Sequence, residues 1–247
     1  MNSYAVSDIG QIRSSNQDFV YASDNPLGIL ENFYLVADGM GGHQGGGFAS
    51  RYTAERMAEL LSQSKDGEVV SLIRNAIQKV NDELYRKSSS YEDLQGMGTT
   101  LVAATILNQV LYVANVGDSR LYVVNDKIRQ ITKDHSWVEV MIAQGQLDRN
   151  SELFYKNKNV ITRAVGVKDE VTADFFEVEL QSGDKVLLCS DGLTNMISDD
   201  EILAVVSRSK TCQETALHLI QKGNAYGGRD NLSVIIIDPE IEEVEVC

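Results

Sequence analysis

Four aspartates lie where an apolar run meets a turn that contains glycine or asparagine. Asp38 ends FYLVAD, Asp118 follows LYVANVG, Asp191 ends KVLLCSD, and Asp230 precedes NLSVIIID. Strand ends are rigid platforms at the solvent boundary, so carboxylates from several of them can converge on one cation. Any one of these aspartates could equally form a turn or a cap. Taken together, the four predict a site for Mg²⁺ or Mn²⁺ rather than zinc.

The segments that must position these aspartates alternate between β-like and helical patterns. Short apolar and β-branched runs predict strands at 4–6, 18–22, 33–37, 99–107, 109–117, 119–125, 185–190 and 232–238. Apolar residues at three and four spacing predict helices at 48–64, 68–87, 201–209 and 214–225. The three central strands are separated by only a few residues, which favours an antiparallel meander. This order predicts an α+β or layered fold rather than an alternating parallel one.

Composition limits the class of protein and its partners. The chain has 247 residues, 43% of them hydrophobic, and no linker-like segment, so we expect one domain over 1–247 that ends in an acidic tail at 240–247. A net charge of -14 disfavours nucleic acid and anionic membranes as partners. Neither a signal peptide nor a membrane-spanning run is evident, and Cys189, Cys212 and Cys247 match no disulfide or zinc pattern. We expect a cytoplasmic monomer.

Eight ordered segments between 13 and 231 resemble the protein phosphatase 2C family, especially its compact bacterial members. They are RSSNQD (13–18), ADGMGGHQGG (37–46), GMGTT (96–100), VGDSRLY (116–122), TKDHS (132–136), ITRAVG (161–166), LLCSDGLTN (187–195) and GGRDN (227–231). Each alone is a weak signal, but eight in order over nearly the whole chain are specific. The resemblance implies a four-layer α-β-β-α sandwich of two antiparallel sheets flanked by helices, with a flap at about 133–166.

The resemblance also implies a ligand set for two or three Mn²⁺ or Mg²⁺ ions. Asp38 would bridge two ions, the carbonyl of Gly39 would bind one, and Asp191 and Asp230 would bind the other. Asp118 would join Asp191 around a third, weaker ion, as in bacterial relatives, or would only form the turn between two strands.

Three further residues receive catalytic roles from the same resemblance. Arg13 would grip the substrate phosphate, a task that suits a planar bidentate donor, although a surface salt bridge would also explain it. Asp18 would hold a metal-bound water or serve a turn. His43 could protonate the departing oxygen. Gln17 departs from the pattern, because some family members, mostly eukaryotic, carry there a glutamate that helps to hold the second metal.

The remaining candidate residues are less specific. His135, in TKDHS, is expected to organise its loop, and His218 is expected to be a helix residue without a catalytic role. The basic cluster of Lys156, Lys158 and Arg163 could attract phosphorylated substrates or form a solvated face. The glycine run at 41–47 lacks the GxxxxGK[ST] pattern of a nucleotide-binding loop.

These residues support a metal-dependent hydrolysis of phosphoserine and phosphothreonine in proteins. Two metal ions would lower the pKa of a bridging water, and the resulting hydroxide would attack phosphorus in line while Arg13 stabilises charge. The resemblance implies that the enzyme reverses a bacterial, membrane-bound serine/threonine kinase. One alternative is a non-catalytic pseudophosphatase that binds phosphoproteins. Another is a metal-dependent nuclease or small-molecule phosphoesterase, of which the acidic surface disfavours the nuclease.

Overall fold

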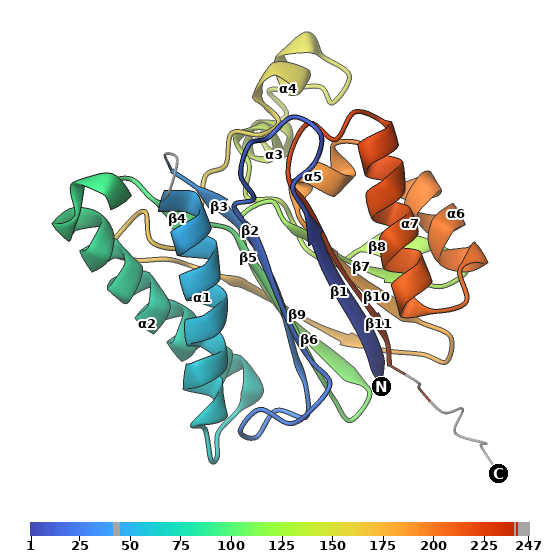
Figure 1. The fold of residues 1–247 in the computed structure, drawn as a ribbon, viewed down its shortest axis with the longest axis horizontal. Helices are drawn as coiled ribbons and strands as arrows, with labels where there is room; N and C mark the ends of the chain where they lie inside the picture. Colours follow the sequence, from blue (N-terminus) through green and yellow to red (C-terminus); the bar gives the residue numbers. More distant parts are fainter. Residues whose placement is uncertain (42–44, 240, 242–247) are drawn as a thin grey trace.

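Two antiparallel sheets form the centre of the computed structural model, which describes residues 1–41, 45–239 and 241 (Figure 1). The first sheet has the order β1-β11-β10-β7-β8, and the second has β2-β3-β5-β6-β9 with β4 beside β3. The strands of the first sheet are β1 Asn2–Asp8, β7 Arg120–Val124, β8 Ile128–Gln130, β10 Lys185–Cys189 and β11 Leu232–Asp238. Those of the second are β2 Asp18–Ser23, β3 Phe33–Met40, β4 Gly98–Thr99, β5 Leu101–Leu107, β6 Val110–Val116 and β9 Asp174–Glu179.

Helices cover the outer face of each sheet (Figure 1). The long helices α1 (Gly45–Ser62) and α2 (Val69–Ser90) pack on the second sheet, followed by the short 3-10 helix η1 (Glu92–Leu94). The first sheet carries α5 (Asp191–Thr194), α6 (Asp199–Arg208) and α7 (Cys212–Ala225). None of the described helices is long and apolar enough to cross a membrane.

Three separate apolar clusters fill the spaces between the four layers. Successive strand side chains point to opposite faces, so each central strand contributes to two clusters. In β3, Leu35 and Ala37 face the helices α1 and α2, whereas Tyr34 and Val36 face the other sheet. The third cluster joins the first sheet to α6 and α7. This arrangement confirms the expected four-layer α-β-β-α sandwich.

The predicted meander over 99–125 is wrong in its last step. β5 and β6 pair with each other, but β7 pairs with β10 and β8 in the other sheet. The chain crosses between the sheets at Gly117, whose φ of 107° is readily adopted only by glycine. Asp118 lies at this crossing. Short apolar runs alone do not show which sheet a strand will join.

The segment expected to be a flap contains two short helices, α3 (Trp137–Ala143) and α4 (Glu152–Asn157), at one end of the sandwich (Figure 1). Both begin at a serine N-cap: the hydroxyl of Ser136 accepts a hydrogen bond from the Glu139 amide, and Ser151 does the same for Phe154. This serine chemistry is visible in the sequence and explains why a polar segment forms helices here.

Candidate metal centre

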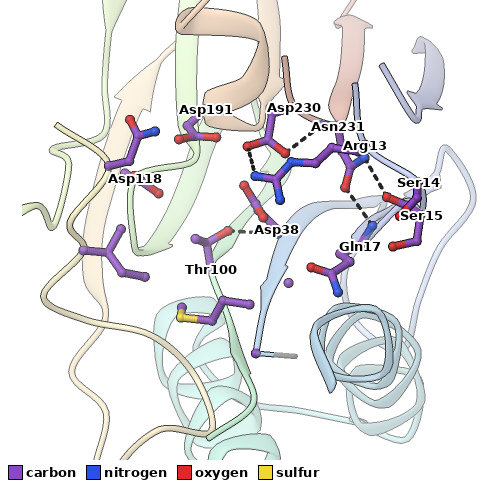
Figure 2. Close-up of a pocket in the computed structure, with 15 residues that line it drawn as sticks. Arg13, Ser14, Ser15, Gln17, Asp38, Thr100, Asp118, Asp191, Asp230 and Asn231 are labelled. Atoms are coloured by element: carbon purple, nitrogen blue, oxygen red, sulfur yellow. Dashed lines mark hydrogen bonds and ion pairs between the residues drawn. The ribbon is translucent and has the colours of Figure 1, made fainter. Parts of the chain in front are cut away.

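A cavity of about 520 Å³ opens at the flap end of the sandwich. Its lining includes Gly39 and four carboxylates, and Figure 2 shows these side chains directed toward a common space. The four carboxylates are Asp38, Asp118, Asp191 and Asp230. The structure therefore brings together all five residues that the sequence nominated as metal ligands.

The carboxylates reach the cavity from both sheets. Asp38 continues the inward-facing alternation of β3, and its backbone N–H donates to Thr100 Oγ1 at 3.0 Å. Asp191 follows β10 at the start of α5, where the side-chain amide of Asn195 donates to its Oδ2 at 2.9 Å. Asp230 lies just before β11, the neighbour of β10. Strand alternation and pairing thus fix the directions of these carboxylates before any ligand is considered.

Asp18 lies behind the cavity rather than in its lining. It is the register partner of Asp38 across the β2–β3 pair and is 7% exposed. Ser190, at the end of β10, donates from Oγ to Asp18 Oδ2 at 2.7 Å and so connects the two sheets. Burial and the nearby carboxylates of Asp191 and Asp230 raise the pKa of Asp18 to about 6. Asp18 thus lies behind the carboxylates that line the cavity.

The electrostatics of this cluster fit a bound cation. Burial, followed by repulsion from neighbouring carboxylates, raises the pKa values of Asp38, Asp118 and Asp191. Like charges on directly opposed strand residues destabilise a sheet, as Asp18 and Asp38 would when both are ionised. A divalent ion would reverse this cost by favouring the ionised form of every carboxylate around it.

The donor set also indicates which kind of cation fits. Among the described residues, the side chains that line the cavity offer carboxylate oxygens and include neither histidine nor cysteine. A closed zinc-type cage is therefore a poor match. Mg²⁺ and Mn²⁺ prefer oxygen, and Mg²⁺ in particular binds one or two carboxylates and keeps water ligands. The carbonyl of Gly39 and water can complete such a shell.

Gly39 is required by close backbone packing. A Cβ at this position would collide with the carbonyl oxygens of Gly46, in α1, and of Gln17. The Gly39 amide also donates to the Gln17 carbonyl at 3.1 Å. The end of β3 can therefore lie against α1 and the residue before β2 only without a side chain, which brings the Gly39 backbone to the cavity wall.

Arg13 lies at the rim with its guanidinium beside the carboxylates (Figure 2). Its Nη2 donates to Asp230 Oδ2 at 2.7 Å, while the side chain remains 53% exposed. The hydrogen bond to Asp230 raises the pKa of Arg13. A permanently charged, partly exposed donor at the mouth of an acidic cavity can meet an anion that enters from solvent.

Asn231 is a functional residue that the sequence reasoning missed. Its Oδ1 accepts from the Gln17 amide at 2.8 Å, and its Nδ2 donates to the carbonyls of Ile9 and Ser15 at 3.0 Å each. The loop that carries Arg13 is thereby fixed beside Asp230. The GGRDN motif, which ends in Asn231, is the sequence signal for this residue. Gln17 lines the cavity as well.

His135 organises its loop, as expected. Its Nδ1 accepts from the Gly117 amide at 3.1 Å, and its Nε2 lies 3.1 Å from Asp174 Oδ2. The pKa of His135 is lowered by burial, so the neutral ring suits the acceptor role of Nδ1. The carbonyl of His135 also accepts from the Thr162 amide at 2.7 Å. His135 thus links the turn that bears Asp118 to the end of the flap.

The other candidates are dispersed. Lys156 pairs with Glu152 on α4, and Arg163 pairs with Asp174, so these two cations are already engaged. The pKa of Asp191 is raised by burial and by Asp230, and the charge of Lys158 opposes this rise. His218 lies on α7 with its Nδ1 3.5 Å from Ser209 Oγ, away from the cavity lining. His43 falls outside the described residues.

Comparisons with known proteins give the family. A family model for protein phosphatase 2C matches residues 11–223. The chain belongs to the protein phosphatase 2C family. The serine/threonine phosphatase stp of Listeria monocytogenes is 38% identical over 96% of this chain and 95% of its own length. This agreement confirms the resemblance drawn from the eight motifs.

Solved structures of this phosphatase family match the whole fold. The serine/threonine phosphatase PstP/Ppp of Mycobacterium tuberculosis superposes with a TM-score of 0.85 and 33% identity, covering 95% of this chain and 97% of that one. A PstP catalytic domain in complex with two manganese ions gives a TM-score of 0.82 and 33% identity, covering 95% and 96%. The chain is a protein phosphatase of the 2C type with the corresponding sandwich fold.

Proposed function

We propose that the chain hydrolyses phosphoserine and phosphothreonine in proteins, with two divalent cations bound in the acidic cavity. The observation that carries this proposal is the convergence of Asp38, Asp191 and Asp230 from two different sheets beneath the guanidinium of Arg13. Anion-binding and cation-binding groups on facing sides of one cavity suit a substrate that is a phosphate and a cofactor that is a metal.

The residues divide between holding the ions and holding the substrate. Asp38 would bridge two ions, the Gly39 carbonyl would bind one, and Asp191 and Asp230 would bind the other, with Asp118 available to a third. When bound, such ions supply an activated water and stabilise charge on the phosphoryl oxygens. The PstP domain with two manganese ions supports a count of at least two and favours manganese.

Side chains of the protein orient the substrate, hold water and donate a proton. Arg13 orients the phosphoryl group and neutralises charge on its oxygens, while the loop held by Asn231 limits its movement. Asp18 holds water and fixes Ser190 beneath the ligands. We retain His43 as a proposed proton donor to the departing oxygen.

The cellular setting is proposed on the support of the family rather than of the cavity. We propose that the protein acts as a monomer in the cytoplasm, in signal transduction, and reverses phosphorylation by a serine/threonine kinase. The described surface is consistent with phosphoprotein substrates, since Arg13 stands exposed at the cavity mouth.

The test measures manganese-dependent phosphate release from a phosphothreonine peptide by native protein and Asp38→Asn. We expect release by the native protein and a loss of at least about a hundredfold in the variant, because a direct ligand should matter more than the outer partners of metal ligands. Asp126→Asn is the matched control, since Asp126 is an exposed aspartate in the β7–β8 turn. Equal rates in the two aspartate variants would refute the assignment.

The pseudophosphatase alternative is not favoured. Its mark would be a missing ligand, yet Asp38, Gly39, Asp191 and Asp230 all line the cavity. Isothermal titration of manganese into native protein separates the two cases, because a pseudophosphatase that had lost its centre would bind no ion.

A further inference from the structure

A second cavity of about 430 Å³ adjoins the metal cavity. The two share Met40 and Ile161 in their linings, so these two residues lie at the boundary between the cavities. Apart from Met40, the second cavity is lined by one stretch of chain, 161–172, which leads from the flap toward β9. A group bound at the metal centre could therefore extend into this space without leaving the protein surface.

The wall of the second cavity is held in place before any ligand arrives. Buried Asn81, on α2, accepts from the Gly166 amide at 2.8 Å and donates to the carbonyl of Lys168 at 2.9 Å. Thr99 and Val165 exchange two backbone hydrogen bonds of 3.0 and 2.9 Å. Sites for small groups are usually preformed in this way, which lowers the entropic cost of binding.

The lining combines apolar side chains with polar and charged ones, which are Thr162, Arg163, Lys168, Glu170 and Thr172. The apolar side chains are Met40, Ile161, Ala164, Val167 and Val171. Val167 is 42% exposed, an apolar side chain left at the surface. Arg163 is neutralised by Asp174 at 2.8 Å.

We propose that this second cavity is a recognition subsite for the protein substrate, which binds an aliphatic side chain within two residues of the phosphorylated serine or threonine. The proposal rests on the proposed function, since it takes the metal cavity as the place where the phosphate binds. An extended peptide advances about 3.3 Å per residue, with side chains on alternate faces. A near neighbour of the phosphoresidue can therefore pass Met40 and Ile161 and enter the apolar space.

The first arm of the test varies the substrate. Phosphothreonine peptides carry a single leucine at each position from three residues before to three residues after the phosphothreonine, against an all-alanine background, and kcat/KM is measured with manganese. We expect one position within two residues of the phosphothreonine to raise kcat/KM by at least about tenfold, the scale on which apolar pockets discriminate side chains. A change below twofold at every position would overturn the proposal.

The second arm varies the protein. Val167→Asp places a charge on the apolar wall, and Val140→Asp is its matched control, because Val140 is a 44% exposed valine on α3 that lines neither cavity. We expect Val167→Asp to lower kcat/KM for the leucine peptide at least tenfold relative to kcat/KM for p-nitrophenyl phosphate, which has no flanking residues. The control should leave this ratio within twofold of the native value.

The possible outcomes separate the subsite from the activity itself. Equal losses on peptide and p-nitrophenyl phosphate in Val167→Asp would overturn the subsite, as would an equal shift of the ratio in Val140→Asp. A change of elution volume in Val167→Asp without a change of the ratio would identify a self-association surface instead. Native, manganese-loaded protein that hydrolyses neither substrate would refute the proposed function, which is a distinct result.

Discussion

Arg13 Nη2 lies 2.7 Å from Asp230 Oδ2, so the cation assigned to the substrate contacts a carboxylate assigned to a metal. The two residues are 217 positions apart in the chain. They meet because β1 pairs with β11 and because Asn231 and the carbonyl of Gly228 bind the backbone around Arg13. Asp230 thus faces both functional groups of the centre. With metal and phosphate bound, Asp230 would contact the metal and Arg13 would contact the phosphate.

Replacing Arg13 should weaken substrate binding more than metal binding. We expect Arg13→Ala to lower kcat/KM for a phosphothreonine peptide about tenfold to a hundredfold, because hydrogen bonds to charged groups contribute about 1.5–3 kcal/mol. Arg13→Lys should recover only part of this loss, since an ammonium lacks the bidentate fork. Steady-state kinetics with manganese in excess measure both variants. A KM unchanged by Arg13→Ala would show that Arg13 is a surface ion pair.

The stability of the protein without metal should fall as pH rises. A carboxyl group with a raised folded pKa stabilises the folded state below its unfolded pKa, and this contribution is lost as pH rises through the folded value. For Asp18 the window runs from about pH 4 to about 6, and Asp38, Asp118 and Asp191 are shifted in the same direction. Manganese should therefore raise Tm more at pH 7.5 than at pH 5, by on the order of 5 °C.

The titration of His135 changes folding stability with pH in the opposite direction to that of the carboxylates. The experiment must therefore distinguish the two contributions. Because the pKa of His135 is lowered by burial, its contribution to folding stability increases as pH rises toward 6.5. The comparison of Tm with and without manganese at each pH removes this effect, since His135 contacts the Gly117 backbone rather than a proposed ligand. A manganese-induced rise in Tm that does not change with pH would contradict the assignment of the carboxylates.

Gln17 can be tested by restoring the charge that it lacks. Gln17 lines the metal cavity, and Gln17→Glu would add a carboxylate there. We expect the manganese concentration for half-maximal activity to fall severalfold, and the Tm of the metal-free variant to fall because another carboxylate joins the acidic cluster. Gln17→Ala is the control and should leave the manganese dependence near the native value. An equal shift in both variants would indicate loss of packing rather than gain of charge.

Asn231 should affect substrate binding through the loop that it holds. We expect Asn231→Ala to lower the free energy of unfolding by about 1–3 kcal/mol, because three partly buried backbone groups lose a hydrogen-bond partner. The KM for a phosphopeptide should rise more than kcat falls, since Arg13 loses its fixed position. Asn125→Ala is the control, because Asn125 donates to Ser182 and Asp184 in a turn outside the metal cavity. A similar rise of KM in both variants would contradict the positioning role.

Much of the candidate site was predictable because it depends on local patterns. The apolar run FYLVA followed by Asp38 and Gly39 marks a strand that ends in a polar turn, and the same reasoning located Asp191 and Asp230. The motif family supplied the grouping of these residues and the role of Arg13. Whether each residue has the assigned role stays a prediction, to be decided by the variants above.

The remainder depends on contacts between distant parts of the chain. The crossing at Gly117 and the pairing of Asp18 with Asp38 follow from sheet assembly, which no local window contains. The edge strand β9 was not predicted, although it pairs with β6 and its Phe176 and Val178 pack against the cluster between the sheets. The hydrogen bond from Asn81 to the carbonyl of Lys168 joins residues 87 positions apart and has no sequence signature.

The metal ligands come from both sheets, and this has a consequence for how the protein tolerates change. Asp38 belongs to β3, whereas Asp191 and Asp230 flank β10 and β11, and the sheets meet through residues such as Val36 and Ile235. An ion bound by ligands from both sheets would fix the distance between the two sheets. Interior substitutions that thicken or thin this interface would then alter metal affinity from a distance. Selection on catalysis would therefore also act on the apolar packing between the sheets.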